Sequence, residues 1–349
     1  MPTFGNSQLK LLEKLCNAIA VSGDEHEVRK LVLEEVQPYA DEVRVDALGS
    51  VLATRVGKAK KRMRVMLDAH MDEVGLIVVA EDGEGIYRFE PVGYVDACNL
   101  VGKQVFVGRE RTPGVIGAKP VHLMDAEEAT RKVPLEALRI DMGPAGKAQV
   151  GDRAGFVTRF RRVGPSIMAK AIDDRIGVAT LVELFKQAPP NVDLCASFSV
   201  QEELDLRGAK VAAQYFKPDL AIVIDSTPAN DLPLHDGSEN TRYNTKLGLG
   251  PAIYVVDGST LHDPRLIRFL CETADMEKIP YQIRQPGGGG TNAGAIQRTL
   301  AGIPAVSVSV PHRYTHSPVS IARLADWKNT IELLHAALKR VTPDLVAAH

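Results

Sequence analysis

The chain has 349 residues, of which 45% are hydrophobic and 25% charged, and its formal net charge is −2. A chain of this length can bury a large core, most simply as one large and one small domain. The near-neutral charge and the lack of a basic stripe argue against nucleic acid as a partner. No apolar run approaches the ~18 residues that span a bilayer, so no membrane association is expected.

The first residues and the cysteines favour a cytoplasmic protein. Residues 1–15 predict an amphipathic helix and lack the cationic segment, apolar core and cleavage site of a signal peptide. The four cysteines, Cys16, Cys98, Cys195 and Cys271, lie far apart and form no C-x-x-C motif. Neither disulfides nor a cysteine-based zinc site is therefore expected. Any metal ion would have to be held by histidines and carboxylates.

The first half of the chain changes texture near residue 72. Two helices are predicted over residues 7–40, with Ser22 or Asp24 near the start of the second. Strands are predicted over 43–56 and 63–69. From 72 to about 164, short β-like runs are broken by Gly, Pro and Asp, and no long helix is indicated. This pattern predicts a small β module, a barrel or a sandwich.

From residue 165 onward, helices and strands alternate. Helices are predicted over 174–187, 206–217, 263–276, 292–299 and 325–340, and strands over 193–200, 219–224, 252–256 and 305–310. Alternation with near-continuous apolar strands predicts an α/β fold, with a mixed sheet covered by helices on both faces. We expect residues 1–70 and 165–349 to form this α/β domain, and residues 71–164 to form an inserted small β-barrel domain.

Possible metal ligands follow five separate apolar segments. In an open α/β sheet, binding sites lie beyond the carboxyl ends of the strands. The residues at these positions are His70 with Asp72, Asp173, Glu202 with Glu203, Asp225, and His316. Each has an ordinary structural explanation when taken alone, such as helix capping by Asp173. Five such segments ending at one edge of a sheet indicate a metal site instead.

The charges of these side chains suit two divalent cations. Three carboxylates and two neutral histidines would leave enough positive charge to hold a hydroxide, whose parent water can reach a pKa near ~7 on a metal ion. Asp72, two residues after His70 on extended chain, could orient the imidazole. Glu202 is left over as a general base. Zinc is the expected metal, with cobalt as the alternative, because both accept these ligands.

Two loop segments invite other interpretations. GGGGTNAG, residues 287–294, lacks the Gly-Lys-Ser/Thr ending of a phosphate-binding loop, so a pliable loop beside the cleft is expected. His235, Arg242 and Lys246 could form a pocket for acidic side chains, although solvated surface charges are the simpler explanation.

Six motifs together resemble peptidase family M42, the di-metal TET and glutamyl aminopeptidases. They are AHMDEVG, KAIDDRIG, SVQEELDLRGAK, VIDS, GGGGTNAGAI and HRYTHSP. The likeness runs nearly end to end and includes GVIGAKPVHLM and VGDRAGF in the insert. It implies that two metal ions are held by His70, Asp173, Glu203, Asp225 and His316. Asp173 would bridge the ions. It is preferred to Asp174 as the ligand because the family motif tolerates Asn at the position of Asp174.

The resemblance also implies an activity. It makes Glu202 the general base, Asp72 the carboxylate that orients His70, and the chain a metallo-aminopeptidase that releases N-terminal residues from peptides with a free N-terminus. A metal-bridging hydroxide would attack the scissile carbonyl. Related N-deacylases and carboxypeptidases are alternatives. An endoglucanase is a more distant alternative. Glycosidases need two carboxyls facing each other across the sugar bond, whereas Glu202 and Glu203 are adjacent, and successive side chains of a strand point apart.

Family members combine an α/β metallopeptidase domain with an inserted small β-barrel domain, and commonly assemble from dimers into hollow dodecamers. The resemblance therefore implies a homo-oligomer. Two positions depart from the family pattern. Asp205 stands where the family usually has Gly, and Asn292 where it usually has Asp. Neither change removes an expected ligand, but both lie near the site and could alter substrate preference.

Overall fold

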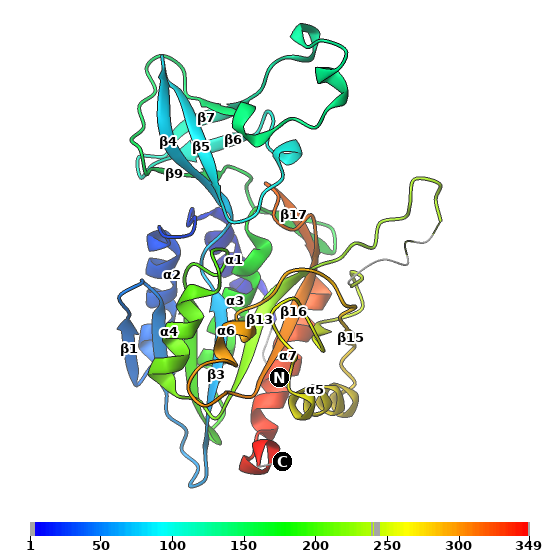
Figure 1. The fold of residues 1–349 in the computed structure, drawn as a ribbon. Coiled ribbons are helices and arrows are strands. Elements are labelled where there is room, and N and C mark those ends of the chain that lie inside the picture. Colours follow the sequence, from blue (N-terminus) through cyan, green and yellow to red (C-terminus); the bar gives the residue numbers. More distant parts are fainter. Residues whose placement is uncertain (1–3, 239, 241–244, 348–349) are drawn as a thin grey trace.

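A large mixed sheet organises most of the computed structural model, which describes residues 4–238, 240 and 245–347 (Figure 1). Its main path runs β1 (Glu42–Val45), β2 (Val51–Arg55), β12 (Val192–Ser199), β3 (Met63–His70), β13 (Leu220–Pro228), β16 (Ala305–Arg313), β17 (Ser320–Arg323), β11 (Ser166–Ala169) and β10 (Arg161–Val163). Two short strands, β14 (Ala252–Ile253) and β15 (Gln282–Ile283), join it beside β16. The central strands β12, β3, β13 and β16 are parallel, and the other pairings along the main path are antiparallel.

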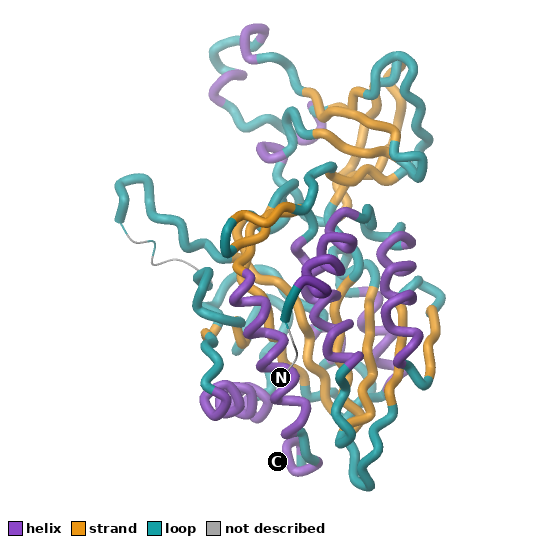
Figure 2. Tube along the Cα trace, turned by 180° about the vertical axis from the view of Figure 1, so that it is seen from behind, coloured by secondary structure: helices purple, strands orange, loops and turns teal. Residues whose placement is uncertain are grey.

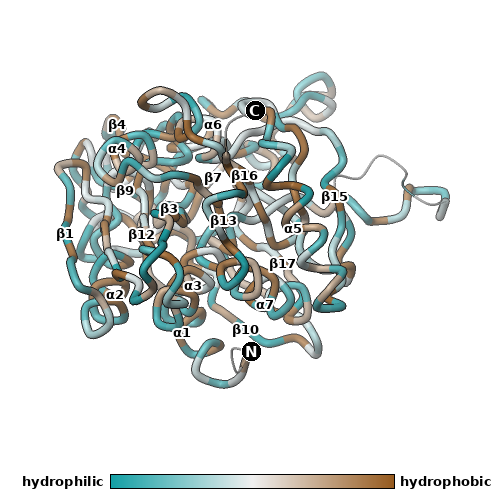
Figure 3. The backbone as a smooth tube through the Cα atoms, turned by 90° about the horizontal axis from the view of Figure 1, so that it is seen from below, coloured by the Kyte–Doolittle hydropathy of each residue, from teal (hydrophilic) through white to brown (hydrophobic). Residues whose placement is uncertain are grey.

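Helices cover both faces of this sheet. They are α1 (Asn6–Asn17), α2 (His26–Val36), α3 (Ile172–Lys186), α4 (Arg207–Phe216), α5 (Pro264–Glu277), α6 (Ala293–Ile296) and α7 (Leu324–Arg340). Viewed from below, α4 and α6 lie on one side of the central strands, and α1, α2, α3 and α7 lie on the other (Figure 3). Figure 2 shows the long helices of the second side from behind. None of the helices in the described part of the chain is long and apolar enough to cross a membrane.

Strand β3 shows why its sequence is apolar almost throughout. Val65 and Leu67 belong to the core under α1, α3 and α7, whereas Met66 belongs to the smaller core under α4 and α6. Successive side chains point to opposite faces of a sheet, so a strand covered on both faces needs apolar residues at both kinds of position. The continuous apolar runs seen in the sequence are explained by this double cover.

A closed six-stranded barrel stands above the end of the sheet at which β3 ends (Figure 1). Around the barrel the order is β4 (Gly75–Gly83), β5 (Ile86–Val92), β8 (Arg139–Asp141), β7 (Thr112–Gly117), β6 (Gln104–Val107) and β9 (Arg153–Phe156). It encloses its own core, which includes Leu76, Val105 and Ile140. The chain enters the barrel directly after His70 and Asp72, so its position is tied to the candidate site.

The predicted fold class is confirmed, since a mixed sheet with helices on both faces carries an inserted β barrel. The domain boundaries at 70/71 and 164/165 remain a prediction. Within the predicted insert, β10 (Arg161–Val163) pairs with β11 and so extends the large sheet. Helix α6 is also shorter than the predicted 292–299, because residues 297–299 form a turn that leads back toward β16.

Candidate active site

The carboxyl ends of the parallel strands bring the candidate residues to one edge of the sheet. His70 is the last residue of β3, and Asp225 lies in the second half of β13. His316 lies in the turn between β16 and β17, and Asp173 lies at the start of α3. Strands β3, β13 and β16 run in the same direction, so residues distant in sequence converge here, as predicted.

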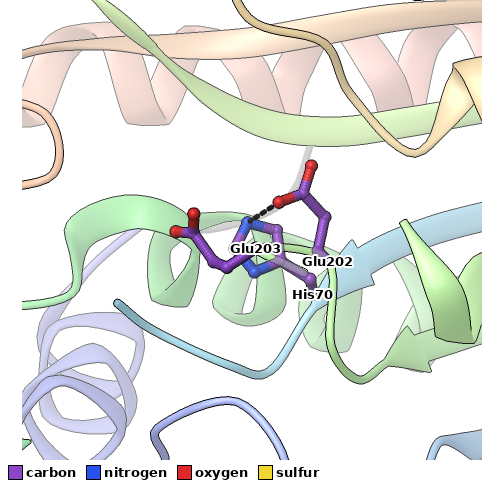
Figure 4. Close-up of side chains that lie close together, drawn as sticks. All are labelled: His70, Glu202 and Glu203. Atoms are coloured by element: carbon purple, nitrogen blue, oxygen red, sulfur yellow. Dashed lines mark ion pairs between the residues drawn. The ribbon is translucent and has the colours of Figure 1, made fainter. Parts of the chain in front are cut away.

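Strand β12 ends at Ser199, three residues before Glu202. On a continuing strand, adjacent side chains would point to opposite faces, and Glu202 and Glu203 could not share a site. Because the chain has left the strand, both carboxylates lie near the ring of His70, and Figure 4 shows the three side chains together. The dashed line there marks the ion pair between His70 Nε2 and Glu202 Oε2, which are 3.9 Å apart.

The five expected ligands fall into two overlapping groups. His70 Nε2 lies 3.2 Å from Asp173 Oδ1 and 3.9 Å from Asp225 Oδ1. His316 Nε2 lies 3.6 Å from Asp173 Oδ2 and 3.3 Å from Glu203 Oε2. In each group, the possible ligand atoms lie within 4.8 Å of one another. Asp173 belongs to both groups and offers one oxygen to each.

The neighbouring aspartate, Asp174, has a different role. Its carboxylate is buried and accepts hydrogen bonds from the backbone N–H groups of Gly177, at 3.0 Å, and His70, at 3.3 Å. These contacts join the first turn of α3 to the end of β3. Asp174 therefore takes the capping function that was the ordinary explanation for Asp173, and the Asp173 carboxylate stays in the histidine and carboxylate cluster.

Asp72 is fully buried behind His70, with its Oδ1 3.4 Å from the imidazole Nδ1. It also accepts hydrogen bonds from the backbone N–H groups of Glu202 and Glu203, at 3.0 and 3.2 Å. Ser22 donates its hydroxyl to the other carboxylate oxygen at 2.6 Å. Instead of starting a helix, Ser22 thus supports Asp72, while Glu25 is the residue that precedes α2. Asp72 therefore connects the end of β3, the residues that follow β12, and the loop before α2.

The cluster holds more negative charge than its surroundings easily tolerate. Burial and the neighbouring carboxylates raise the pKa of Glu202 and Glu203 well above the usual glutamate range. Burial and Asp173 raise the pKa of Asp225 to about 7. Burial also opposes protonation of His70, but Glu202 and the aspartates outweigh it and raise the pKa of the imidazole well above its usual value.

Divalent cations would relieve this mutual repulsion, and the donor types suit them. Imidazole nitrogens and carboxylate oxygens are the ligands that zinc and similar first-row ions accept. Burial disfavours the charged form of Asp173, yet three neighbouring histidines, His70, His316 and His312, lower its pKa. The shared position of Asp173 would let one carboxylate serve two ions. The described residues therefore fit a metal centre of histidines and carboxylates.

A cavity of about 250 Å³ opens beside the cluster. The candidate ligands line this cavity. Gly288–Gly290 of the glycine-rich loop also line it, and this loop was expected to lie beside the cleft. Neither His235 nor Lys246 lines it, and Arg242 lies outside the described residues. The sequence alone did not point to Arg284, which also lines the cavity. The available signal was its place in YQIRQPGGGG, where it is the first residue after the short strand β15 and lies three residues before the expected loop.

The two departures from the family pattern occupy different surroundings. Asp205 is exposed at the cavity and has a φ of 80°, a conformation that glycine adopts more easily. Asn292 is buried and donates its side-chain amide to Asp68 at 2.6 Å and to Ser199 at 2.9 Å. Burial raises the pKa of Asp68 to about 6 despite these contacts. An aspartate at position 292 would place a second carboxylate against Asp68.

Comparison with known proteins gives matches along almost the whole chain. The family described as M42 glutamyl aminopeptidase matches residues 49–333. The lysyl aminopeptidase of Pyrococcus furiosus is 33% identical over 348 residues, covering 96% of this chain and 97% of that protein. Aminopeptidase APDkam598 of the archaeon Desulfurococcus kamchatkensis has a similar structure, with a TM-score of 0.91, 34% identity, and coverage of 98% of this chain and 97% of its own. The TET1 peptidase of Pyrococcus horikoshii, which can assemble into a tetrahedron or a large octahedral shell, has a TM-score of 0.83 at 31% identity, with coverage of 96% of this chain and all of its own.

Proposed function

Because the chain belongs to the M42 glutamyl aminopeptidase family, we propose that it is an aminopeptidase that removes N-terminal residues from peptides at a centre of two divalent metal ions. The family resemblance predicted from the motifs is confirmed, and with it the assignment to the peptidases. The observation that carries the proposal is the pair of ligand groups that share Asp173.

One ion would be held by His70, Asp173 and Asp225, and the other by Asp173, Glu203 and His316. Such ions, when bound, polarise a carbonyl group and make water a better nucleophile. Zinc is the first choice and cobalt the second, since both accept these ligands.

Glu202 is the proposed general base. It forms a third possible group with His70 and Glu203, but the two groups that share Asp173 do not include it. Its Oε2 is close enough to the cluster to take a proton from the attacking water and return it to the departing amine. Asp72 would fix the ring of His70, supported by Ser22.

The test compares two peptides that differ only in a free or an acetylated N-terminus, each incubated with metal-loaded protein. The proposal predicts release of the first residue from the free peptide only. Removal of the acetyl group would indicate an N-deacylase, and release from the other end a carboxypeptidase. Either result would overturn the proposal.

We further propose that the chain forms a homo-oligomer, with dimers that assemble into a dodecamer. The TET1 peptidase of Pyrococcus horikoshii supports this, since it assembles into large shells. Several apolar side chains on and near the barrel are also exposed, including Tyr94, Val121 and Val150. Light scattering of the metal-loaded protein would check the particle mass, and a monomer would contradict the proposal. The cytoplasmic location remains a prediction from the sequence.

A further inference from the structure

A buried arginine lies in the wall of the cavity and has no counter-ion among the residues that the structure describes. Arg284 is only 3% exposed, and it lines the same cavity as the candidate metal ligands. Its Nε donates to Thr227 Oγ1 at 3.2 Å, and its Nη2 donates to the carbonyl of Gly288 at 3.0 Å. The guanidinium carbon lies 4.5 Å from the centre of the Tyr254 ring. Within the described part of the chain, Nη1 has no hydrogen-bond partner and no carboxylate forms an ion pair with Arg284.

A second buried arginine shows what a purely structural role requires. Arg175 is completely buried, and each of its three guanidinium nitrogens has a partner. Its Nε donates to the backbone carbonyl of Met71 and its Nη1 to the backbone carbonyl of Leu15. Its Nη2 forms an ion pair with Glu73 at 3.0 Å. Burying a cation without such compensation is costly, because the charge leaves water and gains nothing equivalent. Arg284 carries this cost at the substrate cavity.

We infer that Arg284 is the counter-ion for the side-chain carboxylate of an N-terminal glutamate or aspartate bound in the cavity. This inference rests on the proposed aminopeptidase function and names the substrate class of that site. A guanidinium suits the task because it is always charged and presents a planar fork to a carboxylate. The contacts to Thr227 and Gly288 hold the side chain in place before substrate binds, which reduces the entropy lost on binding.

Family membership alone does not decide this preference, since one relative is a lysyl aminopeptidase. The competing feature in this chain is Asp205, which also lines the cavity and would favour a basic side chain. Asp205 is exposed, however, so water screens its charge, whereas the charge of Arg284 acts in a buried setting. The stronger electrostatic influence on a bound side chain is therefore that of Arg284.

The test uses metal-loaded enzyme and four peptides that are identical except for an N-terminal Glu, Gln, Leu or Lys. All four end in an amide, so no terminal carboxylate can occupy the site. We expect kcat/KM for the Glu peptide to exceed that for its isostere Gln on the order of 100-fold, since a site built to pair a charged group discriminates against its absence. Arg284→Gln should bring this Glu/Gln ratio to within a few-fold of one, while Arg284→Lys should keep part of the preference.

Arg268→Gln is the matched control. It removes one positive charge by the same substitution, from an exposed position on α5 that does not line the cavity, and it should keep the wild-type ratio. Each ratio is measured within one preparation, so a lower yield of folded Arg284→Gln protein cancels out.

Faster cleavage of the Leu or Lys peptide by the wild type would overturn the inference. So would an equal loss on all four peptides in Arg284→Gln, which would indicate a structural role. A loss in Arg284→Gln that appears only when the same peptides carry a free C-terminal carboxylate would assign Arg284 to that group instead. Failure to cleave any free-amine peptide would overturn the proposed function itself, so the two failures can be told apart.

Discussion

Replacing Glu73 by glutamine is expected to destabilise the protein strongly. Glu73 lies three residues after the end of β3, and it is 2% exposed. Lys170 Nζ donates to both of its oxygens at 2.7 Å, and Arg175 Nη2 lies 3.0 Å away. The backbone N–H of Ala20 donates to it at 2.9 Å. Four segments, from the end of α1 to the start of α3, thus meet at one buried charge.

The glutamine variant keeps an acceptor for Ala20 but leaves Lys170 and Arg175 buried without their anion. Breaking a buried ion pair by removing one partner typically costs about 3–5 kcal/mol. Lys170 can reduce this cost by releasing its proton, because burial already lowers its pKa below the ordinary value of 10.5 even with Glu73 nearby. We therefore expect the free energy of unfolding at pH 7 to fall by about 3–5 kcal/mol in Glu73→Gln.

The pH dependence has a definite sign. In the variant, unfolded Lys170 binds more protons than folded Lys170, so the free energy of unfolding rises with pH. The difference in the free energy of unfolding between the wild type and Glu73→Gln should therefore shrink as the pH rises from 7 toward 10.5, the ordinary lysine pKa.

Urea unfolding followed by fluorescence of Trp327 measures the effect, because this is the one tryptophan of the chain and it is fully buried in the main core. Protein and metal concentrations must be equal across variants, since binding and assembly stabilise the folded state. Glu127→Gln is the control, because Glu127 pairs with Arg131 at an exposed site and the unfolding midpoint should not change. A Glu73→Gln midpoint equal to that of the control would refute the reasoning.

Three further predictions concern the active site. Glu202→Gln should lower kcat on the order of 10²- to 10⁴-fold with the metal content of the protein unchanged, and full activity would exclude Glu202 as the base. Ser22→Ala removes the 2.6 Å hydrogen bond to Asp72, so metal affinity measured by competition with a chromogenic chelator should fall about 10-fold; equal affinity would show that Asp72 does not need this support. Removal of metal by a chelator should abolish peptide cleavage, and zinc or cobalt should restore it, whereas cleavage by metal-free protein would contradict a metal-dependent mechanism.

The sequence was sufficient to predict that the candidate residues meet at one edge of the sheet. Apolar runs precede His70, Asp225 and His316, and they predicted the strands of an α/β sheet. These strands are parallel, and the carboxyl ends of parallel strands meet at one edge of a sheet. The change of texture after residue 72 likewise predicted the inserted barrel. Both inferences depend on local patterns, namely which residues are apolar and which residues follow them.

Only the tertiary structure showed which contacts each of these side chains makes. It placed Asp173 in both possible ligand groups and paired Asp174 with the backbone N–H of Gly177, contacts that support the preference for Asp173 drawn from the family resemblance. It also brought Ser22 to Asp72 and buried Arg284 in the cavity wall with no carboxylate partner in the described part of the chain. Such contacts join residues that are far apart in the chain, so they depend on the packing of whole elements and leave no periodic pattern in the sequence.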